Sequence, residues 1–104
     1  METIIATASE LVEYADHQLE IGDANLSLDG LSAILIVTTD QGPILDDVFL
    51  MLHLPDKRVV VSSTHPGFMD TIEALNQDYT IDYNQVIASM CCAQNARFVL
   101  WSSG

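Results

Sequence analysis

A search for enzymatic chemistry in this sequence begins with five side chains, the three histidines and the two adjacent cysteines: His17, His53, His65, Cys91 and Cys92. Their spacing matches no common metal site, because the sequence contains no C-x-x-C, no H-E-x-x-H and no pair of histidines four residues apart. A cysteine nucleophile and a distant histidine would meet only in the fold, and nothing in the sequence singles out such a pair. We therefore expect a protein that is not an enzyme and has no catalytic residue, no metal and no other cofactor.

Two further motifs contain residue types that could form a site. SSTHPG, at residues 62–67, lacks a glycine-rich phosphate loop, so we interpret His-Pro-Gly as a corner between a strand and a helix. DQGPILDD, at residues 40–47, has three aspartates but not the ligand order of a calcium loop, and we interpret it as a solvated connection.

The charge of the chain restricts its partners. The 104 residues include 15 acidic and only three basic ones, Lys57, Arg58 and Arg97, for a net charge of −12. A nucleic-acid backbone or an anionic membrane would be repelled, so we expect no binding to either. Basic proteins, or proteins with apolar segments that must be kept in solution, are the partners that this charge favours.

The N-terminus, the hydrophobicity of the chain and its two cysteines lead us to expect a cytoplasmic location. Glu2 stands where a signal peptide would have a positive charge, and no stretch is long and apolar enough for a membrane span. Cys91 and Cys92 are adjacent, which disfavours a relaxed disulfide between them, and reduced thiols suit a reducing compartment.

The hydrophobic pattern predicts a single α+β domain over residues 1–104. Residues 8–20 have a helical apolar stripe, with Gly22 as a stop. Residues 31–39, 48–54 and 58–63 are rich in β-branched and apolar residues and predict a three-stranded antiparallel meander. A second helix is predicted after Gly67, with its apolar residues at i, i+4 and i+7.

The last third of the chain fits two structures. VIASMCC and RFVLWSS, separated by the turn-like AQNA, predict a C-terminal hairpin, which we favour. The alternative is a helix over residues 82–95 followed by a strand, because Tyr83, Val86, Ile87 and Met90 also lie on one helical face.

The predicted strands contain more apolar residues than one buried face requires. VFLMLHL, at residues 48–54, does not alternate between apolar and polar residues as a strand with one wet face should. Two helices cover only one face of such a sheet. We expect the other face to meet a second copy or another protein, unless a helix over residues 82–95 covers it.

The predicted order of elements resembles that of the class I chaperones of type III secretion systems, the group that includes the Tir chaperone. LVEYADHQLEIG matches the first helix, VFLMLHLPDKRVVVSSTHPG the strand pair, and IEALNQDY with VIASMCCAQNARFVLW the second helix and final strands. The resemblance implies a homodimer packed through the second helix, here Phe68, Ile72 and Leu75. It also implies that an extended effector segment is held on the sheet and first helix, here by Leu11, Leu19, Val48, Leu50 and Leu52.

These observations lead to two expectations for function. The first is a secretion chaperone-like protein that holds an extended segment of a secreted effector on apolar sheet surface, while its carboxylates keep the complex soluble. The alternative is an immunity or antitoxin-like inhibitor, or a nucleic-acid mimic, that blocks a basic toxin or nuclease with its acidic surface.

Overall fold

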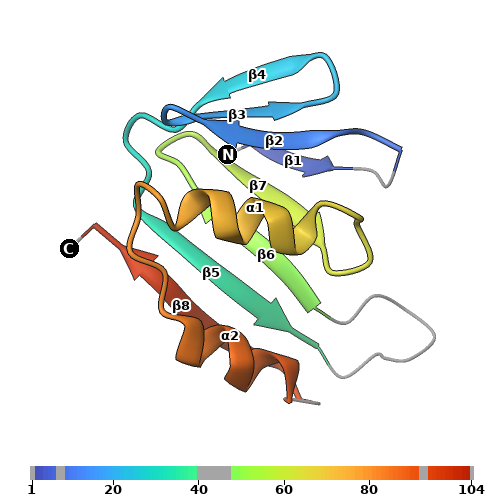
Figure 1. Cartoon of the computed structure of the whole chain (residues 1–104), viewed down its shortest axis with the longest axis vertical. Coiled ribbons are helices and arrows are strands. Elements are labelled where there is room, and N and C mark those ends of the chain that lie inside the picture. Colours follow the sequence, from blue (N-terminus) through green and yellow to red (C-terminus); the bar gives the residue numbers. More distant parts are fainter. Residues whose placement is uncertain (1, 7–8, 40–47, 92–93, 104) are drawn as a thin grey trace.

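A computed structural model describes residues 2–6, 9–39, 48–91 and 94–103. The chain forms two sheets and two helices (Figure 1). The larger sheet has the order β1-β7-β6-β5-β8, and the smaller has the order β2-β3-β4. The eight strands and two helices are β1 (Glu2–Ala6), β2 (Val12–Ala15), β3 (Gln18–Ile21), β4 (Ala24–Ser27), β5 (Ala33–Thr38), β6 (Val48–His53), β7 (Lys57–Ser62), α1 (Phe68–Leu75), α2 (Tyr83–Met90) and β8 (Ala96–Ser102).

The predicted architecture of an N-terminal helix followed by a meander is wrong. The chain is α+β, but it begins with β1, and residues 8–20 contribute β2 and β3 in place of a helix. The three predicted strands are present as β5, β6 and β7 and pair antiparallel. They form the middle of a larger sheet, because β1 adds in parallel to β7 and β8 adds antiparallel to β5.

A tight turn explains why residues 8–20 are not helical. Asp16 and His17 have φ values of 51° and 62°, the left-handed region that an α-helix cannot use. They form the two-residue connection of a hairpin in which Ala15 pairs with Gln18, as in a type I′ turn. Gly22, expected to end a helix, has φ 58° and begins the next two-residue turn, between β3 and β4.

The favoured C-terminal hairpin is also wrong, and the alternative of a helix plus a strand is correct. Asp82 caps α2, since its Oδ1 accepts a hydrogen bond of 3.1 Å from the backbone N–H of Asn84. Val86 and Ser89 are the buried residues of α2. The final strand, β8, pairs with β5 across the sheet rather than with residues 86–92.

One hydrophobic core joins both sheets and both helices. Its residues include Leu19 from β3, Leu50 from β6, Ile72 from α1 and Val86 from α2. Figure 1 shows α1 and α2 on the same side of the five-stranded sheet, with the smaller sheet beside α1. The sequence left open the possibility that a helix over residues 82–95 covers the second face of the large sheet. The helix found there, α2, lies on the same face as α1, so it does not cover the second face.

The second face of the large sheet, which we call the outer face, carries alternate residues of its strands. On β6, Val48, Leu50 and Leu52 are buried in the core, whereas Phe49 and Met51 point the other way and are half-buried. The register extends the outer face across all five strands through Thr3, Ile5, Ala33, Leu35, Val37, Phe49, Met51, His53, Arg58, Val60, Ser62, Arg97, Val99 and Ser102. No helix or strand in the described part of the chain packs against these side chains.

Candidate functional site

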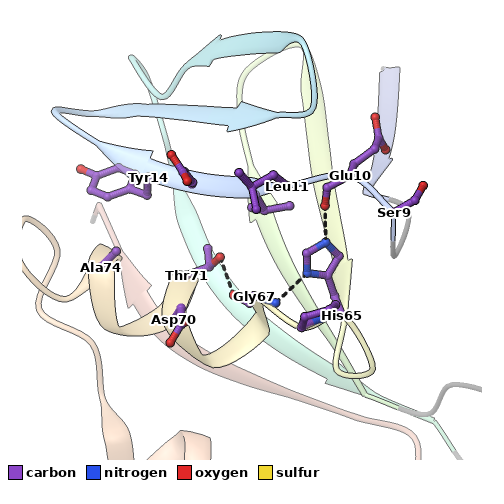
Figure 2. A pocket seen from close by; sticks show the side chains of 12 residues that line it. Ser9, Glu10, Leu11, Tyr14, His65, Gly67, Asp70, Thr71 and Ala74 are labelled. Atoms are coloured by element: carbon purple, nitrogen blue, oxygen red, sulfur yellow. Dashed lines mark hydrogen bonds between the residues drawn. The ribbon is translucent and has the colours of Figure 1, made fainter.

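The clearest concave site lies between strand β2 and helix α1. β2 is an edge strand, since the smaller sheet has the order β2-β3-β4. A groove of about 560 Å³ separates its free edge from α1, and Figure 2 shows β2 along one wall and α1 along the other. Ligand sites commonly have volumes of roughly 300–1,000 Å³, so the groove is large enough to bind a short segment of chain.

The free edge of β2 offers unpaired backbone groups to this groove. Gly22 N–H donates to the carbonyl of Leu11 at 2.8 Å, which makes Val12 and Ile21 a pair without mutual hydrogen bonds in the antiparallel register. Glu13 then exchanges its hydrogen bonds with β3, while the N–H and C=O groups of Val12 and Tyr14 point away from β3. Both residues line the groove.

Two hydrogen bonds of the His65 ring fix the distance between the segment before β2 and the start of α1 at one end of the groove. The N–H of Gly67 donates to His65 Nδ1 at 2.9 Å, so Nδ1 carries no proton and Nε2 donates to the carbonyl of Glu10 at 2.7 Å. His65 is only 6% exposed. The neutral ring therefore joins the segment before β2 to the start of α1, which confirms the interpretation of His-Pro-Gly as a structural corner.

A hydrogen-bonded cluster of aromatic side chains closes the other end of β2. The Tyr14 hydroxyl donates to Asp78 Oδ2 at 2.7 Å and accepts from the backbone N–H of His17 at 3.1 Å. His17 Nδ1 lies 3.1 Å from the Tyr79 hydroxyl, and the Tyr79 ring packs edge-on against Trp101 at 4.8 Å. Burial first, and then the hydrogen bond to Asp78, raise the pKa of Tyr14 above its ordinary value. Burial also raises the pKa of Tyr79.

The groove is acidic with one apolar projection. Its lining includes the acidic residues Glu13 and Asp70 and the backbone of Glu10, whose carboxylate lies beside Gly22 instead, and the described lining residues include no lysine or arginine. Leu11 is 68% exposed and extends from the start of β2 into the groove. The chemistry that fits is a segment with basic and apolar side chains.

The structure places most of the predicted contact residues inside this chain. Leu11 is exposed in the groove, but the other predicted partner contacts are buried in the core, namely Leu19, Val48, Leu50 and Leu52. The predicted dimer residues Phe68, Ile72 and Leu75 are buried against the strands of the same chain. Besides Leu11 and the outer face, the described residues expose apolar side chains on the helices, namely Met69 on α1 and Tyr83, Ile87 and Met90 on α2.

The predicted absence of a metal site stays a prediction, but the candidate ligands do not converge. His17 lies in the β2–β3 turn, His53 on the outer face and His65 beside the groove. Cys91 is exposed after α2, and Cys92 lies outside the described residues, as does the DQGPILDD segment. Among the residues described, no group of three or more histidine, cysteine or acidic side chains could hold a metal ion.

The sequence patterns did not predict the groove, because they predicted a helix for the residues that form β2, one of its two walls. One signal for it was present: Val12 and Tyr14 alternate with polar residues, as do Leu19 and Ile21, around the central Asp-His. This pattern suits two short strands as well as it suits a helical stripe.

Comparison of the chain with protein-family models, with curated proteins and with solved structures gave no match. Within the described residues, no helix has the length and apolar character needed to cross a membrane. The interpretation of the groove therefore depends on its own geometry.

Proposed function

We propose that this chain is a non-enzymatic binding protein that holds an extended segment of a partner protein in the groove between β2 and α1. The observation that carries the proposal is the open edge of β2, where Val12 and Tyr14 direct backbone donors and acceptors into a groove of about 560 Å³. An extended segment that pairs with this edge would become a fourth strand of the smaller sheet, a common mode of peptide recognition.

The groove's side chains define the segment that would bind best. Glu13 and Asp70 favour lysine or arginine, and Leu11 offers contact to an apolar side chain. Because alternate residues of a strand point to opposite sides, a segment that alternates basic and apolar residues can satisfy both. The net charge of −12 would also speed the approach of a basic segment.

Binding of an extended segment was the first function expected from the sequence, and we retain it. The proposed site is now the groove between β2 and α1 in place of the apolar sheet surface. Two elements that carried the resemblance to secretion chaperones, the N-terminal helix and the C-terminal hairpin, are different in the structure. A segment held in extended form still suits the groove. That the partner is a secreted effector and that the location is cytoplasmic stay predictions.

Amide hydrogen exchange tests the binding mode directly. The probe is a short synthetic peptide of alternating lysine and valine, and its matched control is the same peptide with glutamate in place of lysine. We expect the lysine peptide to protect the amides of Val12 and Tyr14, which face the groove. The amide of Glu13, which already pairs with β3, should change little.

Two pairs of matched variants test the position of the site. Asp70→Lys should weaken binding of the lysine peptide roughly fivefold, while Glu73→Lys, on the same helix but outside the groove, should change it less. Ala74→Trp should fill the groove, with the exposed Ala88→Trp of α2 as its control. Equal effects within either pair, or protection of neither Val12 nor Tyr14, would contradict the proposal.

Salt dependence separates this function from the alternative of an acidic inhibitor. Strand addition depends on backbone hydrogen bonds and apolar contact, so binding should weaken only moderately as salt is raised. Binding that disappears at high salt, with no amide protected along β2, would favour an inhibitor that acts through its carboxylates alone.

A further inference from the structure

The outer face of the five-stranded sheet forms a second, separate apolar surface. Its middle row runs across every strand without a polar residue: Ile5, Val60, Met51, Leu35 and Val99. Phe49 and Val37 extend this row toward one end of the sheet. At its two outer ends, Ile5 is 65% exposed and Val99 is 52% exposed.

This surface is independent of the core. Leu35 is only 7% exposed because its strand neighbours surround it, yet it is not part of the hydrophobic core cluster. The partly buried apolar residues of the outer face, Val37, Phe49, Met51 and Val60, do not pack against that cluster either. The row is therefore apolar without being needed for the packing of the described core.

The described strands present basic but no acidic side chains on the outer face, which is unusual for a chain with a net charge of −12. Strands β5, β6, β7 and β8 contain no acidic residue, and Glu2 of β1 points to the opposite face from Ile5. The face instead carries Arg58 and Arg97, two of the three basic residues of the chain. Protein interfaces are depleted in aspartate and glutamate and enriched in arginine, methionine and aromatic residues in the same way.

The two arginines are not neutralised within the described part of the chain. Neither Arg58 nor Arg97 forms an ion pair there, and Arg58 Nε is buried with no hydrogen-bond acceptor. Buried polar atoms without a partner are rare in folded proteins. Because atoms of the same chain cover Arg58 Nε, an acceptor from another molecule could reach only the rest of that guanidinium, whereas Arg97 is exposed to such an acceptor.

We propose that the outer face is the interface of a homodimer, in which two copies pack their five-stranded sheets face to face. A two-fold axis running across the strands places each strand opposite its equivalent and exchanges its two ends. The middle rows of the two copies then pack on each other, with Met51 opposite Met51. Arg58 lies opposite Ser62 of the second copy and Arg97 opposite Ser102, so no arginine faces another arginine across the interface.

The size of the face is sufficient for a stable dimer. Five strands spaced about 4.8 Å apart, with about six residues at 3.3 Å each, cover on the order of 500 Å² in flat projection. Side chains make the accessible area larger than the projection, which approaches the roughly 800 Å² per partner of a standard interface. The outer face has no acidic side chain on its described strands, so none of these would be buried between the two copies.

Sedimentation of matched variants tests the interface, which does not depend on the groove. We expect the wild-type protein to be a dimer at micromolar concentration and to dimerise more tightly at high salt, because salt screens the repulsion between two acidic copies. Val99→Glu and Ile5→Glu should each raise the dimer dissociation constant at least tenfold. Ile87→Glu, at a position 64% exposed on α2, is the control and should leave it unchanged.

All three positions are solvent-exposed in the single chain, so the substitutions should leave its fold intact, as far-UV circular dichroism would verify. A wild-type protein that remains monomeric at high salt would overturn the proposal, including the case in which the outer face binds only a foreign protein. A dimer that resists both Val99→Glu and Ile5→Glu would also overturn it.

Discussion

At the scale of single residues, two hydrogen-bonded side chains determine the shape of the groove. His65 links the carbonyl of Glu10 to the N–H of Gly67, and Tyr14 links β2 to Asp78 beyond α1. Both are ordinary candidates for catalysis by residue type, but each is occupied by contacts within the chain. Their role is to position the two walls between which a partner segment would lie.

Replacing His65 should lower the free energy of unfolding, because its ring links two segments of the chain. His65→Ala removes two part-buried hydrogen bonds, to the carbonyl of Glu10 and from the N–H of Gly67, so we expect a loss of about 2 kcal/mol in the free energy of unfolding. Glu73→Ala, at an exposed position on α1 outside the groove and the outer face, should lose much less. Urea denaturation of both variants measures the difference, and equal losses would show that His65 is not a structural link.

Tyr14 should make the protein sensitive to alkaline pH. The folded state raises the pKa of Tyr14 above its unfolded value of about 10, so its contribution to stability is complete below that pH and is lost as pH rises further. Tyr14→Phe should cost about 1 kcal/mol at neutral pH, because the bond to Asp78 is lost. The variant should lose less stability than the wild type above pH 10, measured by denaturation over a pH series, whereas parallel pH profiles would contradict this account.

At the scale of secondary structure, the β2–β3 hairpin is the element that decides the site. The same residues that give a helical stripe also alternate in two short strands, so local pattern alone leaves the choice open. The hairpin prevails because Val12, Leu19 and Ile21 then face the core beneath, while the Asp16-His17 turn returns the chain. Only this arrangement gives the molecule a free strand edge opposite α1.

Asp16→Ala distinguishes the hairpin from the helix that sequence patterns predicted. Alanine is the best helix former, so the substitution would stabilise a helix. In the hairpin, residue 16 has φ 51°, where alanine is strained and aspartate is better tolerated. We expect the free energy of unfolding to fall by about 1 kcal/mol. A gain in stability by urea denaturation would contradict the hairpin.

At the scale of the whole molecule, acidic and basic residues lie on different surfaces. The 15 acidic residues far outnumber the basic ones, yet two of the three basic residues lie on a face whose strands carry almost no acid. The groove shows the reverse pattern, with carboxylates and no base among its described lining. The molecule thus presents two surfaces that suit different partners, a basic segment and a second copy of the chain.

Repulsion among the carboxylates should limit the stability of the protein at low salt. Raising sodium chloride from about 0.01 M to 1 M shortens the screening length from about 30 Å to about 3 Å. The midpoint of thermal unfolding should rise by roughly 4 °C or more, equivalent to about 1 kcal/mol. Most of the rise should occur at the low end of the salt range, where screening changes most. A linear rise across the whole range would indicate preferential exclusion of salt instead.

The sequence by itself determined the parts of the fold in which local pattern has one solution. The β-branched and apolar runs of β5, β6 and β7 can form only buried strands, and Phe68, Ile72 and Leu75 share one face of α1. The surplus of apolar residues around Met51 also predicted a sheet face that the helices do not cover. These features are local, because side-chain spacing and β propensity act within a few residues.

Tertiary structure alone decided the two ends of the chain and both candidate sites. Residues 8–20 and 82–95 fit helix and strand patterns alike, and contacts between residues distant in sequence selected one: Val12 and Leu19 against the core, and β8 against β5. The groove and the outer face depend on the same long-range pairing. Whether an apolar side chain such as Val48 or Met51 is buried or available to a partner is set by what packs across the sheet, and spacing along the chain does not contain that information.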